Sequence, residues 1–361
     1  MNHQARLQSL QQTVESKKLD GLLISHPPNL RYLCGFTGST GALLVNSGES
    51  VFFTDGRYTE QANAEVRDAK IAIGRKAPLT AAAEWVERRG RGKRSRVIGV
   101  EGEYLTVAAR HRLADALPKH IRLREAPPLV EQARMVKDAE EVEAIRAAVA
   151  AGARLFDRAL EVIRPGVREI EVAAEMEYAA RRAGADAMSF ETIIASGARS
   201  ALPHGRASEA VIGSGFVVCD FGVILHGYCS DRTRTVYVGS APGEARQFYA
   251  AVLAAQEAAL AEVGPGVSLG RVDRAARKVL QGKGLAKHFT HSTGHGVGLE
   301  IHEAPRVAKG QQEVLRPGMV ITIEPGVYLP GKWGVRIEDM VAVTERGCEV
   351  LNSTHKEFIV I

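Results

Sequence analysis

The chain has 361 residues, of which 45% are apolar and 25% charged, and its formal net charge at pH 7 is +5. These values exclude a disordered or low-complexity protein, and the length predicts two domains or one large domain. The small excess of positive charge gives no reason to expect a nucleic-acid partner.

The first 125 residues predict an α/β domain, because apolar runs of strand length alternate with helical patterns. Helices are expected at 7–18, 79–89 and 105–117, and strands at 22–24, 42–45, 51–54, 71–73 and 97–100. The basic run 88–96 contains no aromatic residues on which bases could stack. We therefore predict a solvated loop there, and nucleic-acid contact is the less favoured interpretation.

Two adjacent prolines, Pro127 and Pro128, interrupt this alternation. A long Ala-, Glu- and Arg-rich stretch follows from Ala133 to about Leu160 and predicts a helix. We place the domain boundary within 126–134, which divides the chain into residues 1–130 and residues 131–361.

The second part contains a faint internal repeat with an offset of 100 residues. The clearest match aligns Pro165-Gly166-Val167 with Pro265-Gly266-Val267, and each copy lies between two Ala-rich helical patterns. A β-rich stretch with acidic residues follows each copy. The pattern predicts a duplicated α+β unit, although identities this few also arise by chance.

Acidic residues stand in two predicted strands of the segment 217–235, which resembles a β-hairpin. Asp220 ends an apolar run, and Asp231 begins the return strand. Carboxylates on buried strands are costly unless they are paired or bind a metal. The structural alternative is that Asp231 pairs with Arg232 or Arg234 and that Asp220 caps the turn.

Two later segments add further polar groups. Residues 288–302 hold four of the eleven histidines, among them His291, His295 and His302, with glycines on both sides of His295. This segment lacks the preceding strand of a dinucleotide site and the Gly-Lys-Ser/Thr of a P-loop. Residues 320–339 contain two strands that each end near a glutamate, Glu324 and Glu338, and exposed glutamates are the alternative there.

Together these segments offer four carboxylates and one imidazole, with no thiolate. The set consists of Asp220, Asp231, His295, Glu324 and Glu338. It is too anionic for a core unless two divalent cations neutralise it. Such ligands favour manganese, iron or cobalt over a structural zinc site, with zinc still possible. The residues alone therefore predict a dinuclear metal hydrolase.

In their order and context these five residues resemble the ligands of the pita-bread metallopeptidases, the family of methionine aminopeptidase, aminopeptidase P and prolidase. The resemblance extends over most of residues 133–361 and rests on the strings CDFG, GYCSDRTRT, HSTGHGVGLEIHEAP, ITIEPGVY and GVRIED. It implies a duplicated α+β pita-bread catalytic domain. Residues 29–33, 35–39 and 54–58 are similar to the creatinase-type N-terminal α/β domain, which methionine aminopeptidases usually lack.

The resemblance implies a role for each site residue. One metal would bind Asp231, His295, Glu324 and Glu338, and the other Asp220, Asp231 and Glu338. A hydroxide bridging the metals would attack the peptide carbonyl, and Glu324 would pass a proton to the leaving nitrogen. His302 would orient the carbonyl, His204 would contact the substrate or the tetrahedral intermediate, and His291 would line the proline pocket. Arg336 shares a strand face with Glu338 and would orient a neighbouring carboxylate or bind substrate. The structural alternative for His204 is a turn residue after Pro203, and His291 also has a purely structural alternative.

The whole chain resembles a short bacterial Xaa-Pro aminopeptidase, so we expect removal of the residue before a proline in second position. An Xaa-Pro dipeptidase (prolidase), which acts on dipeptides only, is the first alternative, because the strings around His204 and His295 are equally similar to prolidases. A non-catalytic pita-bread binding module is an alternative of another class. A creatinase-like hydrolase is disfavoured, because those relatives lack the metal ligands.

The resemblance further implies two divalent metals, with manganese expected first and cobalt, zinc or iron as alternatives, and a homodimer or larger homo-oligomer. The four cysteines form no C-x-x-C pair, which favours a reduced intracellular protein. The first 24 residues lack the apolar stretch of a signal peptide, and no run is long enough to span a membrane. We therefore expect a cytoplasmic protein.

Overall fold

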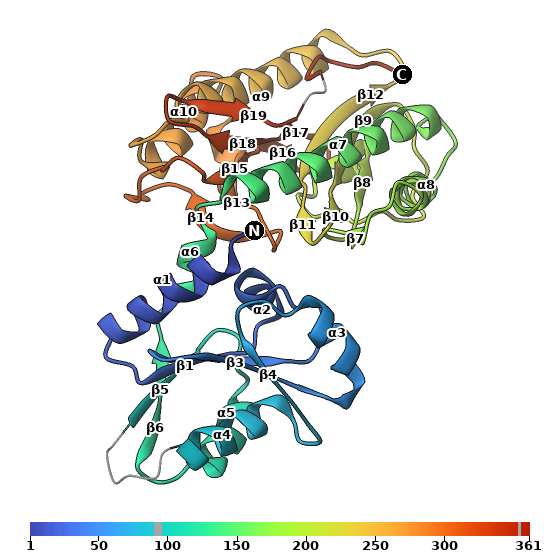
Figure 1. Cartoon of the computed structure of the whole chain (residues 1–361). Helices are drawn as coiled ribbons and strands as arrows, with labels where there is room; N and C mark the ends of the chain where they lie inside the picture. Colours follow the sequence, from blue (N-terminus) through green and yellow to red (C-terminus); the bar gives the residue numbers. More distant parts are fainter. Residues whose placement is uncertain (90–95, 353–354) are drawn as a thin grey trace. The chain divides into compact units, whose positions relative to one another are not determined.

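A computed structural model of the chain describes residues 1–89, 96–352 and 355–361. These residues form two compact units, Met1–Arg134 and Met135–Ile361, each with its own core (Figure 1). Most of the basic run 88–96 lies outside the described residues.

The first unit is built on a mixed six-stranded sheet with the order β4-β3-β2-β1-β5-β6. Its strands are β1 (Gly21–Ile24), β2 (Ala42–Val45), β3 (Ser50–Asp55), β4 (Lys70–Gly74), β5 (Arg96–Glu101) and β6 (Ile121–Ala126). Its helices are α1 (His3–Ser16), α2 (Pro27–Cys34), α3 (Thr59–Glu65), α4 (Pro78–Arg89), α5 (Val107–Ala116) and α6 (Leu129–Arg134). Strands and helices alternate along the chain, as the sequence predicted.

Helices lie on both faces of this sheet (Figure 1), which explains why the central strands β1 and β2 are buried along their whole length. On one face Val86 of α4 and Leu113 of α5 join a buried cluster with Leu23 and Phe53 of the strands. Fully burying such a side chain contributes roughly 1.5–3 kcal/mol. Asn29 of α2, which belongs to one of the N-terminal motifs, is buried and donates hydrogen bonds to carboxylates of two other elements.

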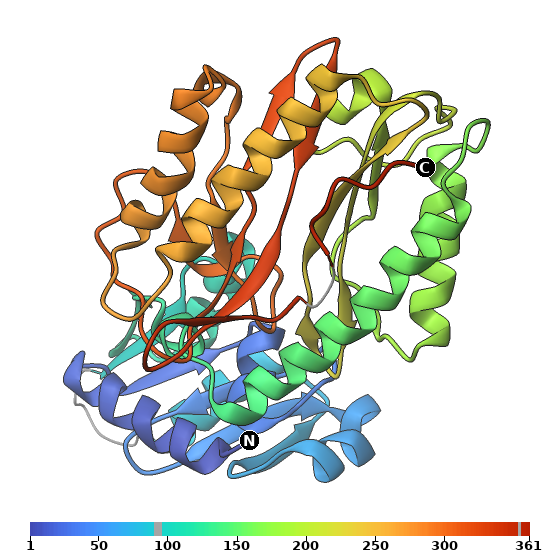
Figure 2. The ribbon, with the colours of Figure 1, turned by 90° about the horizontal axis from the view of Figure 1, so that it is seen from above.

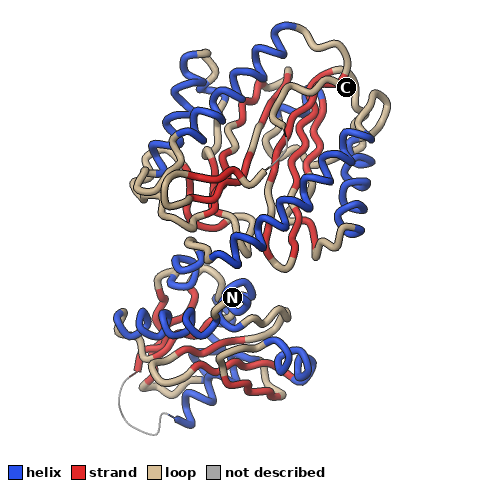
Figure 3. Tube along the Cα trace, turned by 45° about the horizontal axis from the view of Figure 1, so that its top comes forward, coloured by secondary structure: helices blue, strands red, loops and turns tan. Residues whose placement is uncertain are grey.

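The second unit has two halves of the same plan, each with two helices followed by antiparallel strands (Figure 3). The helices are α7 (Ala139–Val162), α8 (Glu169–Arg182), α9 (Gly243–Ala261) and α10 (Leu269–Gly282). The first half holds β7 (Ala187–Met188), β8 (Ile193–Ser196), β9 (Gly215–Phe221), β10 (Val223–Leu225), β11 (Tyr228–Cys229) and β12 (Arg232–Val238). The second holds β13 (Gly294–Gly296), β14 (Glu303–Val307), β15 (Val320–Ile323), β16 (Gly326–Leu329), β17 (Trp333–Arg336), β18 (Asp339–Val343) and β19 (Cys348–Val350).

The repeat predicted from the sequence corresponds to these halves. Helices α8 and α10 begin at Glu169 and Leu269, which preserves the offset of 100 residues. The turn before each helix contains a glycine in the left-handed region, Gly166 at φ 92° and Gly266 at φ 79°. Only glycine adopts this conformation without strain, which accounts for the Pro-Gly pair in both copies.

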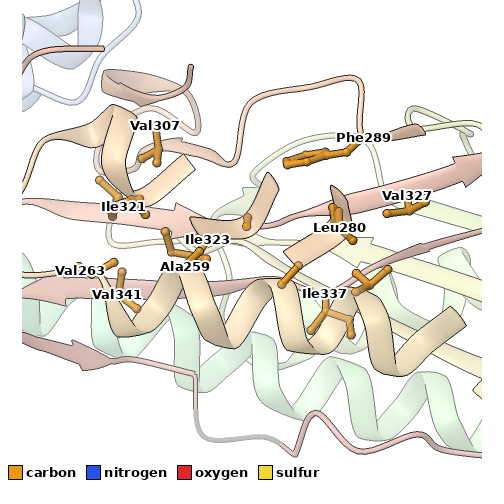
Figure 4. Close-up of a cluster of buried hydrophobic side chains, with 14 of the residues drawn as sticks. Ala259, Val263, Leu280, Phe289, Val307, Ile321, Ile323, Val327, Ile337 and Val341 are labelled. Carbon is orange, nitrogen blue, oxygen red and sulfur yellow. The ribbon is translucent and has the colours of Figure 1, made fainter. Parts of the chain in front are cut away.

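The helices of the second unit pack against its sheets, and α7 and α9 also contact strands of the other half. Strands β12-β9-β8 form one sheet and β14-β13-β15-β18-β19 the other. Leu280 of α10 and Ala259 of α9 pack in one cluster with Ile321, Ile323 and Val341 of the strands (Figure 4). The last residues of the chain run between α7 and α9 (Figure 2), where they hydrogen-bond to β12 through Tyr237.

The long helix predicted from Ala133 to about Leu160 is wrong at its beginning. The chain forms α6 up to Arg134 and starts α7 only at Ala139. Between them Val136 pairs with Met319, and the Lys137 amide donates to Gly318 O, so these residues join the sheet side of the second unit. Asp138 then caps α7 through the Glu141 amide in a capping box.

Candidate metal centre and active site

The two aspartates of the predicted hairpin lie side by side. Strand β9 pairs with β12 so that Asp220 stands opposite Thr233, and Asp231 precedes Thr233 by two residues on the same face. Both aspartates are buried. The connection requires glycine at 222, because a Cβ there would lie 1.9 Å from the Ser230 carbonyl oxygen.

The other three predicted ligands come from the second half. His295 lies in β13, and Glu324 directly follows β15, where its amide donates to Thr293 O at 2.8 Å. Glu338 stands between β17 and β18, and its amide donates to Thr233 O of the first half at 3.1 Å. This last bond brings the carboxylates of the two sheets together.

Three of the five side chains converge on one point, and the other two lie nearby. Ligand atoms of Asp231, His295 and Glu338 all lie within 4.8 Å of one another. His295 Nε2 lies 3.6 Å from Asp231 Oδ2 and 3.4 Å from Glu324 Oε1. Asp220 is near enough for its charge to raise the pKa of Asp231, Glu324 and Glu338.

Burial and mutual repulsion make the ionised form of these carboxylates unfavourable. Burial, together with the neighbouring carboxylates, holds the pKa of Asp231 and of Glu338 well above the usual range. Burial also raises the pKa of Glu324 to about 8 and lowers that of His295 to about 4. In the absence of cations the cluster therefore favours carboxyls that retain protons and a neutral imidazole.

The donor set fits divalent cations. Asp220 Oδ1 and Glu338 Oε1 are buried without a hydrogen-bond partner among the described residues, which leaves two carboxylate oxygens free to coordinate. His295 Nδ1 lies 3.1 Å from Gly296 O, so the proton on Nδ1 is donated there and the lone pair of Nε2 faces the carboxylates. Carboxylates with one imidazole are suitable ligands for manganese, iron, cobalt or zinc.

The contacts in the structure differ from the structural alternatives that the sequence left open for these acids. Arg234 pairs with Asp339 at 2.7 Å rather than with Asp231, and the side-chain nitrogens of Arg232 have no hydrogen-bond partner within the described chain. Asp220 accepts a hydrogen bond from Arg336 instead of capping a turn. Glu338 is only 1% exposed, so it is not a surface glutamate.

Arg232 is a buried arginine whose side chain makes no hydrogen bond within the described residues. Burial and the charge of Arg234 lower its pKa to about 10, and the side chain is 2% exposed. Replacing buried charged groups by apolar side chains is often neutral or stabilising by about 1–4 kcal/mol. We expect Arg232→Met to raise the melting temperature, measured by calorimetry. The matched variant Arg234→Met removes one of the two cations paired with the buried Asp339 and should lower the melting temperature. Equal losses in both variants would contradict the interpretation.

Arg336 contacts one of the predicted ligands, Asp220. It is buried, and it donates to Asp220 Oδ2, to Thr233 Oγ1 at 3.1 Å and to Tyr328 Oη at 2.6 Å. It also donates to the carbonyl of Pro203 at 2.9 Å. Of the two roles expected from the sequence, these contacts favour orientation of a carboxylate over direct substrate binding.

His291 is held on both ring nitrogens by protein groups. Its Nδ1 lies 2.8 Å from Ser292 O and its Nε2 lies 3.0 Å from Tyr328 Oη. Because Tyr328 Oη already accepts from Arg336, its proton is directed to His291. Burial lowers the pKa of His291 to about 4, so the ring is neutral. Since both nitrogens are occupied, the expected contact of His291 with a substrate proline would use a face of the imidazole ring.

His204 and His302 present their rings at the surface of the site. Both are exposed, and the His302 ring meets the His295 ring edge-on with centroids 4.4 Å apart. His302 also lies within electrostatic range of both Asp220 and His204; burial lowers its pKa, and Asp220 opposes that shift. The structure thus brings two exposed imidazoles next to the buried carboxylates.

Two supporting residues escaped the sequence analysis. Thr233 donates to Glu338 Oε2 at 2.8 Å, and Tyr328 joins Arg336 to His291. Alternation along β12 could have identified Thr233, because it shares a face with Asp231. Tyr328 follows Glu324 by four residues, and only the pairing of β16 with β17 brings it to Arg336.

Comparison with known families identifies the chain. The model of metallopeptidase family M24 matches residues 143–345, which is more than half of the chain. The chain belongs to metallopeptidase family M24. The model of the creatinase/prolidase N-terminal domain matches residues 6–136. The fold expected from the sequence, a creatinase-type N-terminal domain and a pita-bread catalytic domain, is confirmed.

Several full-length M24 relatives are similar to this chain. The Xaa-Pro dipeptidase of Pyrococcus furiosus is 36% identical over 98% of this chain and 99% of its own. The structure of an Xaa-Pro dipeptidase from Bacillus anthracis superposes with a TM-score of 0.93 at 39% identity, covering 100% of this chain and 99% of that one. An X-Pro aminopeptidase structure from Thermotoga maritima gives a TM-score of 0.89 at 36% identity, with 99% of both chains covered.

Membership of the family makes the protein a hydrolase of the metallopeptidase type and implies divalent metal ions. Within the described residues, no helix has the length and apolar character needed to cross a bilayer.

Proposed function

We propose that this protein is a metal-dependent Xaa-Pro dipeptidase, which hydrolyses the bond before the proline of a dipeptide. The observation that carries the proposal is the cluster of Asp231, His295 and Glu338, next to two exposed histidines, in a chain with full-length similarity to an Xaa-Pro dipeptidase. The aminopeptidase activity expected from the sequence is less well supported, because most of the named relatives above are dipeptidases. It remains the second candidate, favoured by the similarity to the Thermotoga maritima structure.

Five residues would hold two divalent metal ions, with manganese proposed first. Asp231 and Glu338 would bridge them, Asp220 would complete one site, and His295 and Glu324 the other. The unpartnered oxygens of Asp220 and Glu338 support this assignment. Bound there, the metals would lower the pKa of water and polarise the scissile carbonyl.

The chain's own groups would then act on the substrate. An Xaa-Pro bond has no N–H, and its nitrogen must gain a proton when the bond breaks. Glu324 is half-buried, whereas Glu338 is buried, so Glu324 can hold a proton and pass it to that nitrogen. His302 and His204 would donate hydrogen bonds to the carbonyl oxygen as it gains negative charge.

A dipeptidase must also recognise the free carboxylate of the proline. Arg306 is exposed and stands directly opposite His295 in the β13–β14 pair, so both side chains project from the same face. An arginine can pair with a carboxylate through two hydrogen bonds. We assign the carboxylate of the dipeptide to Arg306.

Arg306→Gln should therefore raise KM for an Xaa-Pro dipeptide by roughly 10- to 100-fold, the value of about 1.5–3 kcal/mol for a hydrogen bond to a charged group. Hydrolysis of the same dipeptide with an amidated C-terminus should change little. Arg346→Gln, in the turn between β18 and β19, is the control. An equal effect on both substrates would show that Arg306 does not recognise the carboxylate.

The proposal is tested by comparing products from Ala-Pro and Ala-Pro-Ala in the presence of Mn²⁺. A dipeptidase releases proline from the first and leaves the second largely intact. Comparable rates on the tripeptide would favour the aminopeptidase. Cleavage of neither peptide with any of the four metals would contradict both.

A further inference from the structure

Glu169, the first residue of α8, has no role in the site described above, yet its carboxylate is fully buried. Its Oε1 accepts hydrogen bonds from the Ser196 amide at 2.8 Å and from Ser196 Oγ at 2.9 Å. Its Oε2 accepts from the Ser208 amide at 3.2 Å, from Ser208 Oγ at 2.7 Å and from Arg199 Nε at 3.1 Å. A buried carboxylate with this many donors is a fixed point in the fold.

The donors to Glu169 enclose one segment of the chain. Ser196 ends β8, Ser208 lies twelve residues later, and His204 stands between them. Arg199 adds a third attachment, because its Nη2 donates to Arg206 O at 2.8 Å while its Nε binds Glu169. We call residues 196–208 the His204 segment. One carboxylate thus fixes both ends of the segment and, through Arg199, its interior.

The opposite side of the His204 segment is attached to the metal-ligand side of the site. Arg336 donates to Pro203 O at 2.9 Å and to the carboxylate of Asp220. Ser200 Oγ accepts the amide of Gly334 at 2.8 Å. The position of His204 relative to Asp220 is therefore set from two sides, by Arg336 near the ligands and by Glu169 behind the segment.

We propose that Glu169 is a positioning residue that places His204 for its contact with the substrate. This inference rests on the role assigned to His204 under the proposed function. His204 is exposed, so no packing around its ring fixes it, and its place depends on the backbone that carries it. Misplacement of a reacting group by about 1 Å can cost roughly a hundredfold in rate.

The second half of the catalytic unit uses the same arrangement. Asp273 on α10, the counterpart of α8, is buried and accepts from Thr293 Oγ1 at 2.8 Å and from Arg277 Nε at 2.8 Å. Arg277 in turn donates to His291 O at 2.7 Å. In both halves a buried acid on the second helix, with an arginine, holds a histidine-bearing segment. This recurrence supports a positioning role for Glu169 rather than a local stability role only.

The test uses Glu169→Gln in the full chain, together with His204→Ala and the double variant. An amide side chain cannot accept the same bonds at both atoms, so the segment should loosen while the five ligands keep their partners. We expect kcat/KM for Ala-Pro to fall by about ten- to a hundredfold. In the His204→Ala background the same change should cost less than about twofold, because the two residues act as a unit. Mn²⁺ affinity, measured by calorimetric titration, should stay within about threefold of wild type.

Two further variants separate positioning from stability. Glu141→Gln removes an equally buried carboxylate that caps α7 and binds Tyr228, and it should lower the melting temperature with kcat/KM almost unchanged. Arg199→Gln changes a half-exposed side chain, so it tests the same attachment if Glu169→Gln folds poorly. Its loss of kcat/KM should be smaller than that of Glu169→Gln. In the His204→Ala background this loss should likewise almost disappear.

Hydrogen exchange of the metal-free proteins gives a readout that needs no activity. Amides of residues 197–207 should exchange faster in Glu169→Gln than in wild type, while β9 and β12 stay protected. Unchanged exchange, or additive losses in the double variant, would overturn the inference. A wild-type protein that cleaves no Xaa-Pro peptide would overturn the proposed function instead, and the exchange result would still decide whether Glu169 holds the segment.

Discussion

Asp231→Asn is expected to abolish metal-dependent hydrolysis and, in the same protein, to make the metal-free fold more stable at pH 8. Asp231 is one of the three residues whose ligand atoms lie within 4.8 Å of one another, and it is proposed to bridge both metals. An asparagine carries no negative charge with which to bind them. A loss of about a thousandfold or more in kcat/KM corresponds to the several kcal/mol that bound metals supply, at about 1.4 kcal/mol for each factor of ten.

The gain in stability comes from the removal of an unfavourable buried charge. Burial, Asp220 and Glu324 raise the pKa of Asp231, so a charged Asp231 is unfavourable in the folded metal-free protein. The neutral amide has almost the same volume and removes that repulsion. Melting curves in chelator at pH 8 would measure the gain, and Asp186→Asn, an exposed aspartate that accepts the Gly227 amide, is the control. Retained activity, or a lower melting temperature than wild type, would contradict the assignment.

The second large effect is the response of the metal-free protein to pH. Its stability should fall as the pH rises from 7 to 8.5. The folded-state pKa of Asp231, Glu324 and Glu338 is raised, to about 8 for Glu324, so in this range the folded chain binds more protons than the unfolded chain. By linkage, stability then decreases with pH: the contribution of these carboxyls is fully present below their unfolded pKa near 4 and is lost as the pH rises through the folded-state pKa.

The range is chosen so that other groups do not interfere. His291 and His295, with pKa values lowered to about 4, act in the opposite direction, but only below about pH 6.5. The buried cysteines, with pKa values raised to about 12, act in the same direction as the carboxyls and contribute little until the pH nears the unfolded thiol pKa of about 8.5. Between these limits the carboxyls of the metal site dominate the change.

Mn²⁺ should reverse this dependence, because the metal competes with protons for the same oxygens. A metal concentration of about 100 times Kd stabilises a folded protein by about 2.7 kcal/mol. The rise in melting temperature on adding Mn²⁺ should therefore be larger at pH 8.5 than at pH 7. Melting of the chelated protein at higher temperature as the pH increases over this range would argue against a carboxylate-rich site.

The proposed ligand set could be predicted from the sequence because each of its four acids lies in or next to an apolar strand. An acid in such a run has few explanations other than pairing or metal binding, and the runs themselves mark the strands. The same logic gave the alternation of strands and helices in the first unit. Alternation along β12 could also have excluded a pair between Asp231 and Arg232, since neighbouring strand residues point to opposite faces.

Contacts between distant residues could not be predicted in this way. Arg336 meets Pro203 and Asp220 only because two sheets from different halves pack together, and nothing local in the sequence of β17 indicates these partners. The role of Glu169 could not be predicted either. A glutamate at the start of a helix is ordinary, and only its hydrogen bonds with Ser196 and Ser208 distinguish this one. The break between α6 and α7 also depends on a distant partner, because Val136 pairs with Met319, the residue before β15.

The central claim is that the carboxylate cluster holds metals that hydrolyse Xaa-Pro dipeptides. The most direct measurement is the rate of proline release from Ala-Pro by protein stripped of metal, before and after Mn²⁺ is added back, with Ala-Ala as the control substrate. The account predicts negligible release without metal, restoration by Mn²⁺ and a strong preference for Ala-Pro. Equal rates with and without metal, or equal cleavage of Ala-Ala, would contradict it.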